Sequence, residues 1–288
     1  MQTKPTFTMK TKILSIIIPV LIMTFIFSCK KENGTNDEIE TTFKLSEDQA
    51  VSEELADDAN TVFFEVAASN GLLSGRTSQV LQSTNTLVCA TVNITPSGSF
   101  PKTITIDFGS GCTSPDGITR KGVITIVLSD SVHIPGATAT MTFNNYFVQD
   151  FKVEGTITWV NTTTAAGFGW TRTIENGKVT SPNGNYYWLH AGVKEVVQTA
   201  GSNTPLNLLD DVFSITGNHT VTNPAGKSRT VTIIEALEKK TICHNISKGK
   251  VKIEGPAHFA ILDYGDGTCD KVATISIDGF SPRTILLP

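Results

Sequence analysis

Strict alternation of apolar and polar residues is the feature of this chain that most constrains its fold. The stretch 103–108 places Ile104, Ile106 and Phe108 on one side and polar residues on the other. The same pattern returns at 138–143, 156–159 and 250–254. A period of two with threonine on the polar side is typical of antiparallel sheets that have one face in water.

Turn-forming pairs punctuate these stretches. Asn176-Gly177 and Asp266-Gly267 are typical of tight hairpins, and the punctuation separates roughly a dozen strands. We therefore expect an all-β fold, a mostly antiparallel sandwich or half-barrel, with one N-terminal amphipathic helix. The formal net charge of −4 shows no basic excess, so we expect no nucleic-acid partner.

Residues 1–28 are predicted to be a lipoprotein signal peptide. Two lysines precede an uncharged run over 13–28, which suits a signal peptide and is short for a transmembrane span. The string Ile26-Phe27-Ser28-Cys29 resembles a bacterial lipobox, which makes Cys29 the expected lipidation site. A plain membrane anchor or an ordinary signal peptide are the alternatives. Two or three acyl chains would give stable anchoring, and we expect a membrane partner.

Residues 29–45 are predicted to be a flexible acidic tether, because they are polar and lack apolar periodicity. Lys31-Glu32 partly resembles a signal that sends such lipoproteins to the cell surface. We therefore expect a lipid anchor in the outer membrane, with surface and periplasmic orientations both open.

The remaining chain, 46–288, is expected to form one β-rich domain that begins with a helix over 46–68. Ser46 is followed by acids in a capping arrangement, and an apolar stripe at helical spacing runs to Val66. The opposite face carries acids that we expect to lie in water, namely Glu53, Glu54, Asp57 and Asp58. A movable lid over a lipid-binding cavity is the alternative role for this helix.

An internal repeat relates the two ends of the β region. The string over 106–112 reads aliphatic, Asp, aromatic, Gly, x, Gly, Cys, and 262–269 repeats it with one extra residue. We interpret this as two related hairpin modules, around 86–128 and 240–278. Four cysteines allow three pairings, and the duplication selects Cys89–Cys112 and Cys243–Cys269 as disulfides.

The Ile-Asp-Phe-Gly-x-Gly-Cys string, the turn at 115–117 and the stretches 144–146 and 154–156 together resemble a family of uncharacterised Bacteroidota outer-membrane or surface lipoproteins. The resemblance covers most of residues 85–285 and implies an all-β exported domain. It implies no catalytic residue or substrate.

Aromatic residues concentrate in the central third of the chain, as Trp159, Trp170, Tyr186, Tyr187 and Trp188. Exposed rings of this kind stack on sugars in carbohydrate-binding modules, which makes these residues weak ligand-binding candidates. Packing in the core and across strands is the competing interpretation.

Asp263, Asp266 and Asp270 lie beside glycines and form a weak candidate for a calcium site. The alternative is that each aspartate caps its own turn. No common catalytic motif is present, so we expect no catalytic residues, no cofactor and no enzyme activity.

We therefore expect a lipid-anchored cell-envelope protein that acts as a non-catalytic binding or structural module. A glycan or another envelope protein is the expected partner. The alternatives are a glycan-binding lipoprotein of a nutrient-uptake system, a carrier of lipid or another hydrophobic ligand, and a hydrolase. The sequence leaves the oligomeric state open.

Overall fold

The computed structural model of the chain describes residues 1–3, 31–73, 86–164, 167–204, 208–278 and 280–288, with the backbone alone for 31–35. The signal peptide and Cys29 lie outside the described residues, so their processing stays a prediction. Within the described residues, no helix is both long and apolar enough to cross a membrane.

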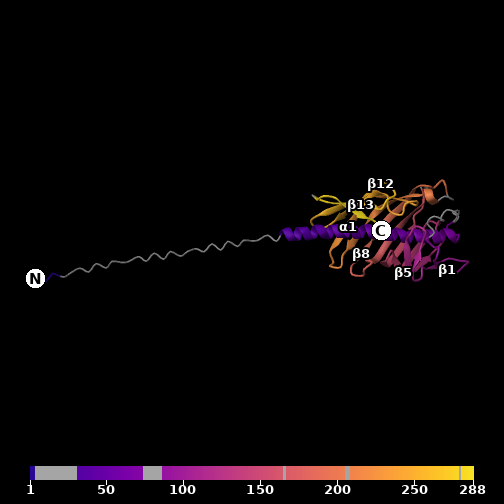
Figure 1. Cartoon of the computed structure of the whole chain (residues 1–288), viewed down its shortest axis with the longest axis horizontal. Coiled ribbons are helices and arrows are strands. Elements are labelled where there is room, and N and C mark those ends of the chain that lie inside the picture. Colours follow the sequence, from indigo (N-terminus) through magenta and orange to yellow (C-terminus); the bar gives the residue numbers. More distant parts are fainter. Residues whose placement is uncertain (4–30, 74–85, 165–166, 205–207, 279) are drawn as a thin grey trace.

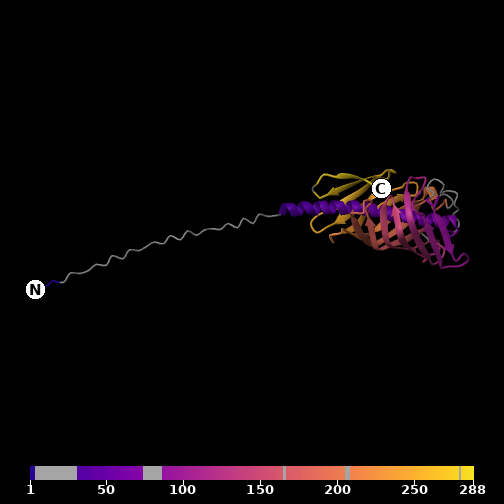
Figure 2. The same ribbon diagram turned by 60° about the horizontal axis from the view of Figure 1, so that its bottom comes forward.

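One long helix, α1 (Lys31–Ser69), runs through the concave side of a strongly curved sheet (Figures 1 and 2). Its 39 residues correspond to a length of about 58 Å at the usual rise per residue. The helix ends where Gly71 adopts a left-handed conformation and Leu72 N donates to Ala67 O at 2.8 Å.

The described residues form one sheet of fourteen strands, and every neighbouring pair in it is antiparallel. The strands are β1 (Thr91–Thr95), β2 (Lys102–Asp107), β3 (Cys112–Thr113), β4 (Thr119–Leu128), β5 (Thr138–Val148), β6 (Phe151–Asn161), β7 (Gly169–Thr180), β8 (Tyr187–Ala200), β9 (Val212–Thr222), β10 (Ser228–Lys240), β11 (Lys248–Glu254), β12 (Phe259–Asp266), β13 (Val272–Ile277) and β14 (Arg283–Leu286). Apart from β3, which pairs with β4, the strands follow chain order from edge to edge.

The predicted all-β fold with one N-terminal helix is confirmed. The sheet remains open, with β1 and β14 at its edges. Its inward side chains pack on α1, so the helix occupies the place that a second sheet would take in a sandwich. Ile104, Ile106 and Phe108 all lie in this core, as the alternation indicated.

Glycines at bulges allow the sheet to curve this tightly. Gly122 has a φ of +80°, and a Cβ there would collide with the backbone carbonyl of Asn145 on β5. Gly155 has a φ of +117°, and its Cβ would lie 2.7 Å from Asn176 O on β7. Both glycines interrupt the register between neighbouring strands, which is where a bulge bends a sheet.

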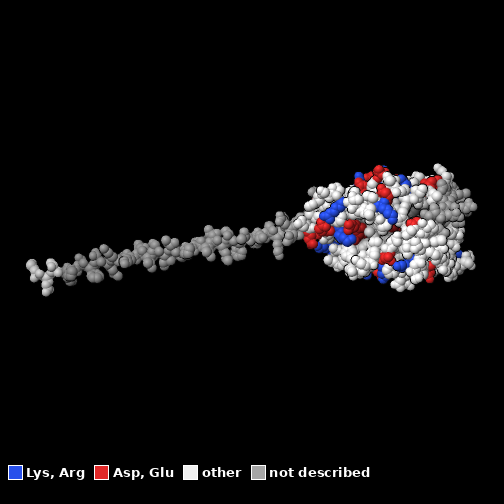
Figure 3. All heavy atoms as spheres, in the orientation of Figure 1, with Lys and Arg blue, Asp and Glu red and all other residues white. Residues whose placement is uncertain are grey.

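The tether predicted over 29–45 is wrong for its described part, because α1 already begins at Lys31. Ile39 and Leu45 are buried in the core, which gives this segment an apolar contact that its polar composition concealed. Salt bridges also hold it to the strands, including Lys227–Asp37 at 2.9 Å and Arg229–Glu38 at 2.8 Å. Figure 3 shows such mixed charges near the end of the body from which the helix emerges.

The expectation that the acidic face of the helix lies in water is also wrong. Its four acids, Glu53, Glu54, Asp57 and Asp58, are all buried. The curved sheet surrounds this face as well as the apolar stripe, and it supplies inward-pointing arginines and lysines as partners. A buried carboxylate is tolerated when it is paired or hydrogen-bonded in this way.

The two repeated strings occupy equivalent places near the two edges of the sheet. In each, the aspartate accepts a hydrogen bond from the glycine two residues on, Asp107 Oδ1 from Gly109 N at 2.7 Å and Asp263 Oδ1 from Gly265 N at 2.9 Å. The aromatic residue between them is buried in both copies. The predicted disulfides, Cys89–Cys112 and Cys243–Cys269, are confirmed.

Candidate ligand-binding cavity

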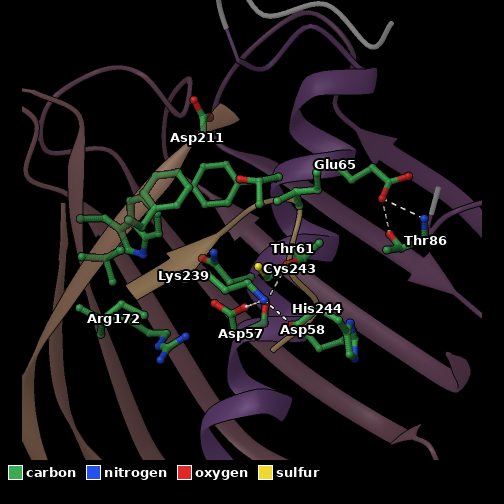
Figure 4. Close-up of a pocket in the computed structure, with 18 of the residues that line it drawn as sticks. Asp57, Asp58, Thr61, Glu65, Thr86, Arg172, Asp211, Lys239, Cys243 and His244 are labelled. Carbon is green, nitrogen blue, oxygen red and sulfur yellow. Dashed lines mark hydrogen bonds and ion pairs between the residues drawn. The ribbon is translucent and has the colours of Figure 1, made fainter. Parts of the chain in front are cut away.

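A cavity of about 630 Å³ lies between the C-terminal half of α1 and the inner face of β7 to β10 (Figure 4). Clefts of this size are typical of small-molecule sites in proteins. The lining includes an apolar group (Phe64, Leu73, Phe168, Trp170, Val196, Leu209, Phe213, Ile215 and Ile242) and a charged group (Glu54, Asp57, Asp58, Glu65, Asp116, Arg120, Arg172, Asp211 and Lys239).

Aromatic rings form one wall of the cavity. Trp170 on β7 is central, with ring centroids 5.0 Å from Phe64 on α1, 5.5 Å from Phe168 and 5.2 Å from Phe213 on β9. Trp170 contacts Phe213 on β9, and the helix brings Phe64 against Trp170 and Phe168. The contacts are tilted or edge-on, as expected for rings that pack without sandwich stacking.

Charged side chains form a second part of the lining. Lys239 Nζ lies 2.8 Å from Asp57 Oδ2 and also donates to His244 O. Arg120 forms a two-pronged ion pair with Asp58, in which Nε lies 3.1 Å from Oδ2. Both of these helix carboxylates, Asp57 and Asp58, therefore meet a cation that a strand directs inward.

Glu54 departs from this pattern of close ion pairs. Its Oε1 accepts a hydrogen bond from Ile246 N at 3.1 Å. Burial raises the pKa of the Glu54 carboxyl to about 7, although the charge of Lys239 opposes the rise. The carboxyl of Glu54 in the cavity lining therefore gains or loses its proton near neutral pH.

Two further acids of the lining accept hydrogen bonds from uncharged groups. Glu65 Oε2 accepts from Thr86 N at 2.9 Å and from Thr86 Oγ1 at 2.6 Å. Asp211 Oδ1 accepts from Gln198 Nε2 at 2.7 Å. In Figure 4 Asp211 lies above the drawn aromatic rings and Glu65 to their right, whereas Lys239 and Arg172 lie below them.

Three buried polar atoms of the lining have no hydrogen-bond partner: Asn60 Oδ1, Trp170 Nε1 and Arg172 Nε. Trp170 and Arg172 are each 2% exposed and Asn60 is 8% exposed. Arg172 is held from its other side, where NH2 donates to Glu53 Oε1 at 2.6 Å. Trp159 Nε1 and Tyr264 OH are likewise unpartnered although neither residue lines the cavity, so such atoms do not by themselves mark a ligand site.

The structure separates the central aromatics that the sequence grouped together. Trp159, Trp170 and Trp188 are buried in the core, so the interpretation of these three as exposed sugar-stacking rings is wrong. Among them, Trp170 alone lines the cavity. Tyr186 is partly buried and donates to Asp48 Oδ2 at 2.6 Å, and Tyr187 is 37% exposed beside Lys178.

The three aspartates that were candidates for a calcium site each accept hydrogen bonds from the residue two positions further along the chain. Asp263 accepts from Gly265 N, Asp266 from Thr268 N and Oγ1, and Asp270 from Val272 N. No group of three metal-ligating side chains forms anywhere in the described ranges.

Five basic residues that the strands bury against α1 carry no recognised motif, and three of them, Arg120, Arg172 and Lys239, line the cavity. A signal for them exists, because each stands two positions from a buried apolar residue in its strand or directly before it, in the phase of the inward face. The pairs are Arg120 with Ile118, Arg172 with Trp170, Lys194 with Val196, Arg229 with Val231, and Lys239 with Leu237.

Comparison with protein-family models finds no match for this chain, and the same holds for the curated proteins and for the solved structures.

Proposed function

We propose that this chain is a lipid-anchored protein of the cell envelope whose β domain binds a small hydrophobic molecule in the cavity beside α1. The observation that carries the binding function is the cavity itself, with its aromatic wall around Trp170. A mostly apolar pocket with a few polar groups is the usual form of a small-molecule site.

The role is binding and transport rather than catalysis. Two carboxylates that α1 itself carries, Asp57 and Asp58, are paired with Lys239 and Arg120. Such pairs hold α1 in the sheet, which leaves them poorly placed to exchange protons with a substrate. The long helix within the sheet also gives the carrier hypothesis a cavity, which the sequence predicted only as one alternative.

Binding is tested with N-phenyl-1-naphthylamine, an uncharged dye that fluoresces in apolar surroundings. We expect saturable binding to the purified β domain with its helix. Val196→Phe adds volume inside the cavity and is expected to weaken dye binding at least tenfold. Val197→Phe is the matched control, because Val197 is the next residue of β8 and is exposed on the outer face.

Either of two results would overturn the binding proposal: no saturable dye binding, or equal binding by the two phenylalanine variants. Circular dichroism of both variants establishes that they are folded. Overpacking by one phenylalanine ordinarily costs about 1–3 kcal/mol, which a domain of this size tolerates.

The anchor is tested separately, through the predicted lipidation of Cys29. The Cys29→Ala variant is expected to lose its acyl chains and to leave the membrane fraction after extraction at high pH. A variant that stays membrane-bound would refute lipid anchoring at this cysteine without affecting the proposal for the cavity.

A further inference from the structure

The entrance of the cavity is marked by those lining residues that reach solvent. Within the described lining, only Asp116, Ile242 and His244 are exposed. Asp116 lies in the turn between β3 and β4, and the other two lie in the loop between β10 and β11. These segments belong to the two repeated hairpin modules, so each module supplies one side of the entrance.

A chain of polar contacts ties the Asp116 side of the entrance to α1. Arg120 pairs with Asp58 of the helix and its NH1 donates to Ser114 Oγ at 2.8 Å. Ser114 Oγ donates in turn to Asp116 Oδ1 at 2.7 Å. The carboxylate of Asp116 is therefore held at the surface, directly above a buried ion pair.

The other side of the entrance is tied to the same turn of the helix. Lys239 pairs with Asp57, the neighbour of Asp58, and donates to the backbone carbonyl of His244. Because Asp57 and Asp58 are consecutive, the two hairpin modules meet at one point along α1. The entrance is thus a fixed feature of the fold.

The lining carries more acids than bases. Once the pairs of Asp57 with Lys239 and of Asp58 with Arg120 are set aside, one permanent cation, Arg172, remains among the described lining residues. The carboxyl groups that remain are those of Glu54, Glu65, Asp116 and Asp211. The charge of Arg172 is also shared with Glu53, which Lys194 contacts as well. Charges act across several ångströms in a medium of low dielectric, so these carboxyls disfavour an anion without touching it.

The lining cations nearest the entrance report the same bias. Burial lowers the pKa of Lys239, but the charges of Asp57 and other helix acids outweigh burial and raise it. The paired carboxylate likewise raises the pKa of Arg120 against the effect of burial. Arg172, which Figure 4 shows on the side away from His244, has a pKa that burial lowers. The preference for positive charge therefore belongs to the entrance.

An apolar chain has ring surface within reach further inside. Phe64, Phe168 and Phe213 all line the cavity and are only partly buried, so they present accessible surface to it. An alkyl chain laid against them would be removed from water, which is the usual source of affinity for apolar ligands.

We infer that the cavity takes a cationic amphiphile such as a long-chain amine, with its apolar chain against Phe64, Phe168 and Phe213 and its ammonium group at the entrance beside Asp116. The ammonium stays partly in water there, which avoids most of the cost of burying a charge. This inference rests on the proposed binding function and specifies its ligand class. It separates the ligand from fatty acids and other anionic amphiphiles.

A series of probes with one chain length and three head groups tests the inference on the unmodified protein. Decylammonium, decan-1-ol and decanoate compete with N-phenyl-1-naphthylamine at pH 8, above the pKa of about 7 of Glu54 and below the aggregation limits of the probes. We expect decylammonium to displace the dye at a lower concentration than the alcohol, and at least about tenfold lower than decanoate. Displacement by decan-1-ol or decanoate at an equal or lower concentration would overturn the inference.

A substitution tests the placement of the ammonium group. Asp116→Asn removes one charge at the entrance, and we expect decylammonium to bind about threefold more weakly, as for one partly screened ion pair, with dye affinity unchanged. Asp266→Asn is the matched control, because Asp266 is also an exposed turn aspartate but does not line the cavity. An equal effect of both substitutions would refute the placement beside Asp116.

The two proposals fail in distinguishable ways. If the dye does not bind, the binding function and the ligand class fall together. If the dye binds, Val196→Phe weakens its binding and decanoate or decan-1-ol competes best, the cavity is a binding site and the cationic head group alone is wrong. The head-group series involves no substitution, so it decides the ligand class even where Asp116→Asn does not fold.

Discussion

Replacing Glu54 by glutamine should stabilise the protein above neutral pH. Burial raises the pKa of Glu54 from 4.5 to about 7, so the folded state holds a proton that the unfolded state releases between these values. Stability therefore falls as the pH rises from 4.5 to 7, and above pH 7 the full cost of ionising the buried carboxyl remains. Each pKa unit is worth about 1.4 kcal/mol, so the cost is on the order of 3 kcal/mol.

Glutamine removes this cost and retains a side-chain oxygen for the hydrogen bond from Ile246 N. At pH 8 we expect Glu54→Gln to raise the free energy of unfolding by up to about 3 kcal/mol. At pH 5 the gain should shrink to under about 1 kcal/mol, because glutamate is then mostly protonated in the folded state. Urea denaturation followed by tryptophan fluorescence, with the disulfides intact, measures both values.

Glu235→Gln is the control for this experiment, because Glu235 is a half-exposed glutamate on β10 that pairs with Lys250 at the surface. We expect it to change stability by no more than about 0.5 kcal/mol at either pH. The reasoning is refuted if Glu54→Gln destabilises the protein at pH 8, or if its effect is the same at pH 5 and pH 8.

Three further substitutions test the interior and its supports. Asp58→Asn leaves the buried guanidinium of Arg120 without its counter-ion, and the loss in unfolding free energy should be about 3–5 kcal/mol by chemical denaturation. Cys89→Ser removes the disulfide to Cys112 and should cost about 3 kcal/mol in the same assay. Gly122→Ala forces a Cβ into the backbone of β5 at positive φ, and thermal melting should show a large fall in Tm or no folded protein.

Each of these three has a comparison that would contradict it. Asp150→Asn breaks a surface pair with Lys121 and should cost under about 1 kcal/mol, so an equal effect of Asp58→Asn would refute the buried pair. Gly117 has a similar φ of +84° with open space around it, so Gly117→Ala should be milder than Gly122→Ala. The Cys89–Cys112 disulfide would be contradicted if, under oxidising conditions, Cys89→Ser were as stable as the unsubstituted protein.

The sheet could be predicted from the sequence because its signal is local. Alternation at Ile104 and Ile106 reports directly which side of a strand is buried, and the repeated Asp-aromatic-Gly string reports the turn that follows. The pairing of Cys243 with Cys269 followed from the same repeat.

The helix surroundings and the cavity could not be predicted in the same way. An acidic helix face such as Glu53 and Asp57 is normally solvated, and it becomes buried here because strands distant in sequence supply Arg172 and Lys239. The cavity likewise combines side chains from α1 and from four neighbouring strands, with no short motif. The sequence carried a weaker indication, a basic residue in phase with buried neighbours, which becomes interpretable once the sheet is known to surround a helix.

The central position of α1 sets an order for the folding of the chain. The helix is the first described element, yet it contacts β12 and β13 near the other end of the sequence. The hydrophobic core around α1 therefore cannot form completely until nearly the whole chain is available. Because so many of its contacts join residues distant in the sequence, we expect the protein to fold slowly. Until then the acids of α1 lack the partners they have in the native structure, since Arg120, Arg172 and Lys239 all come from strands that follow the helix in the chain.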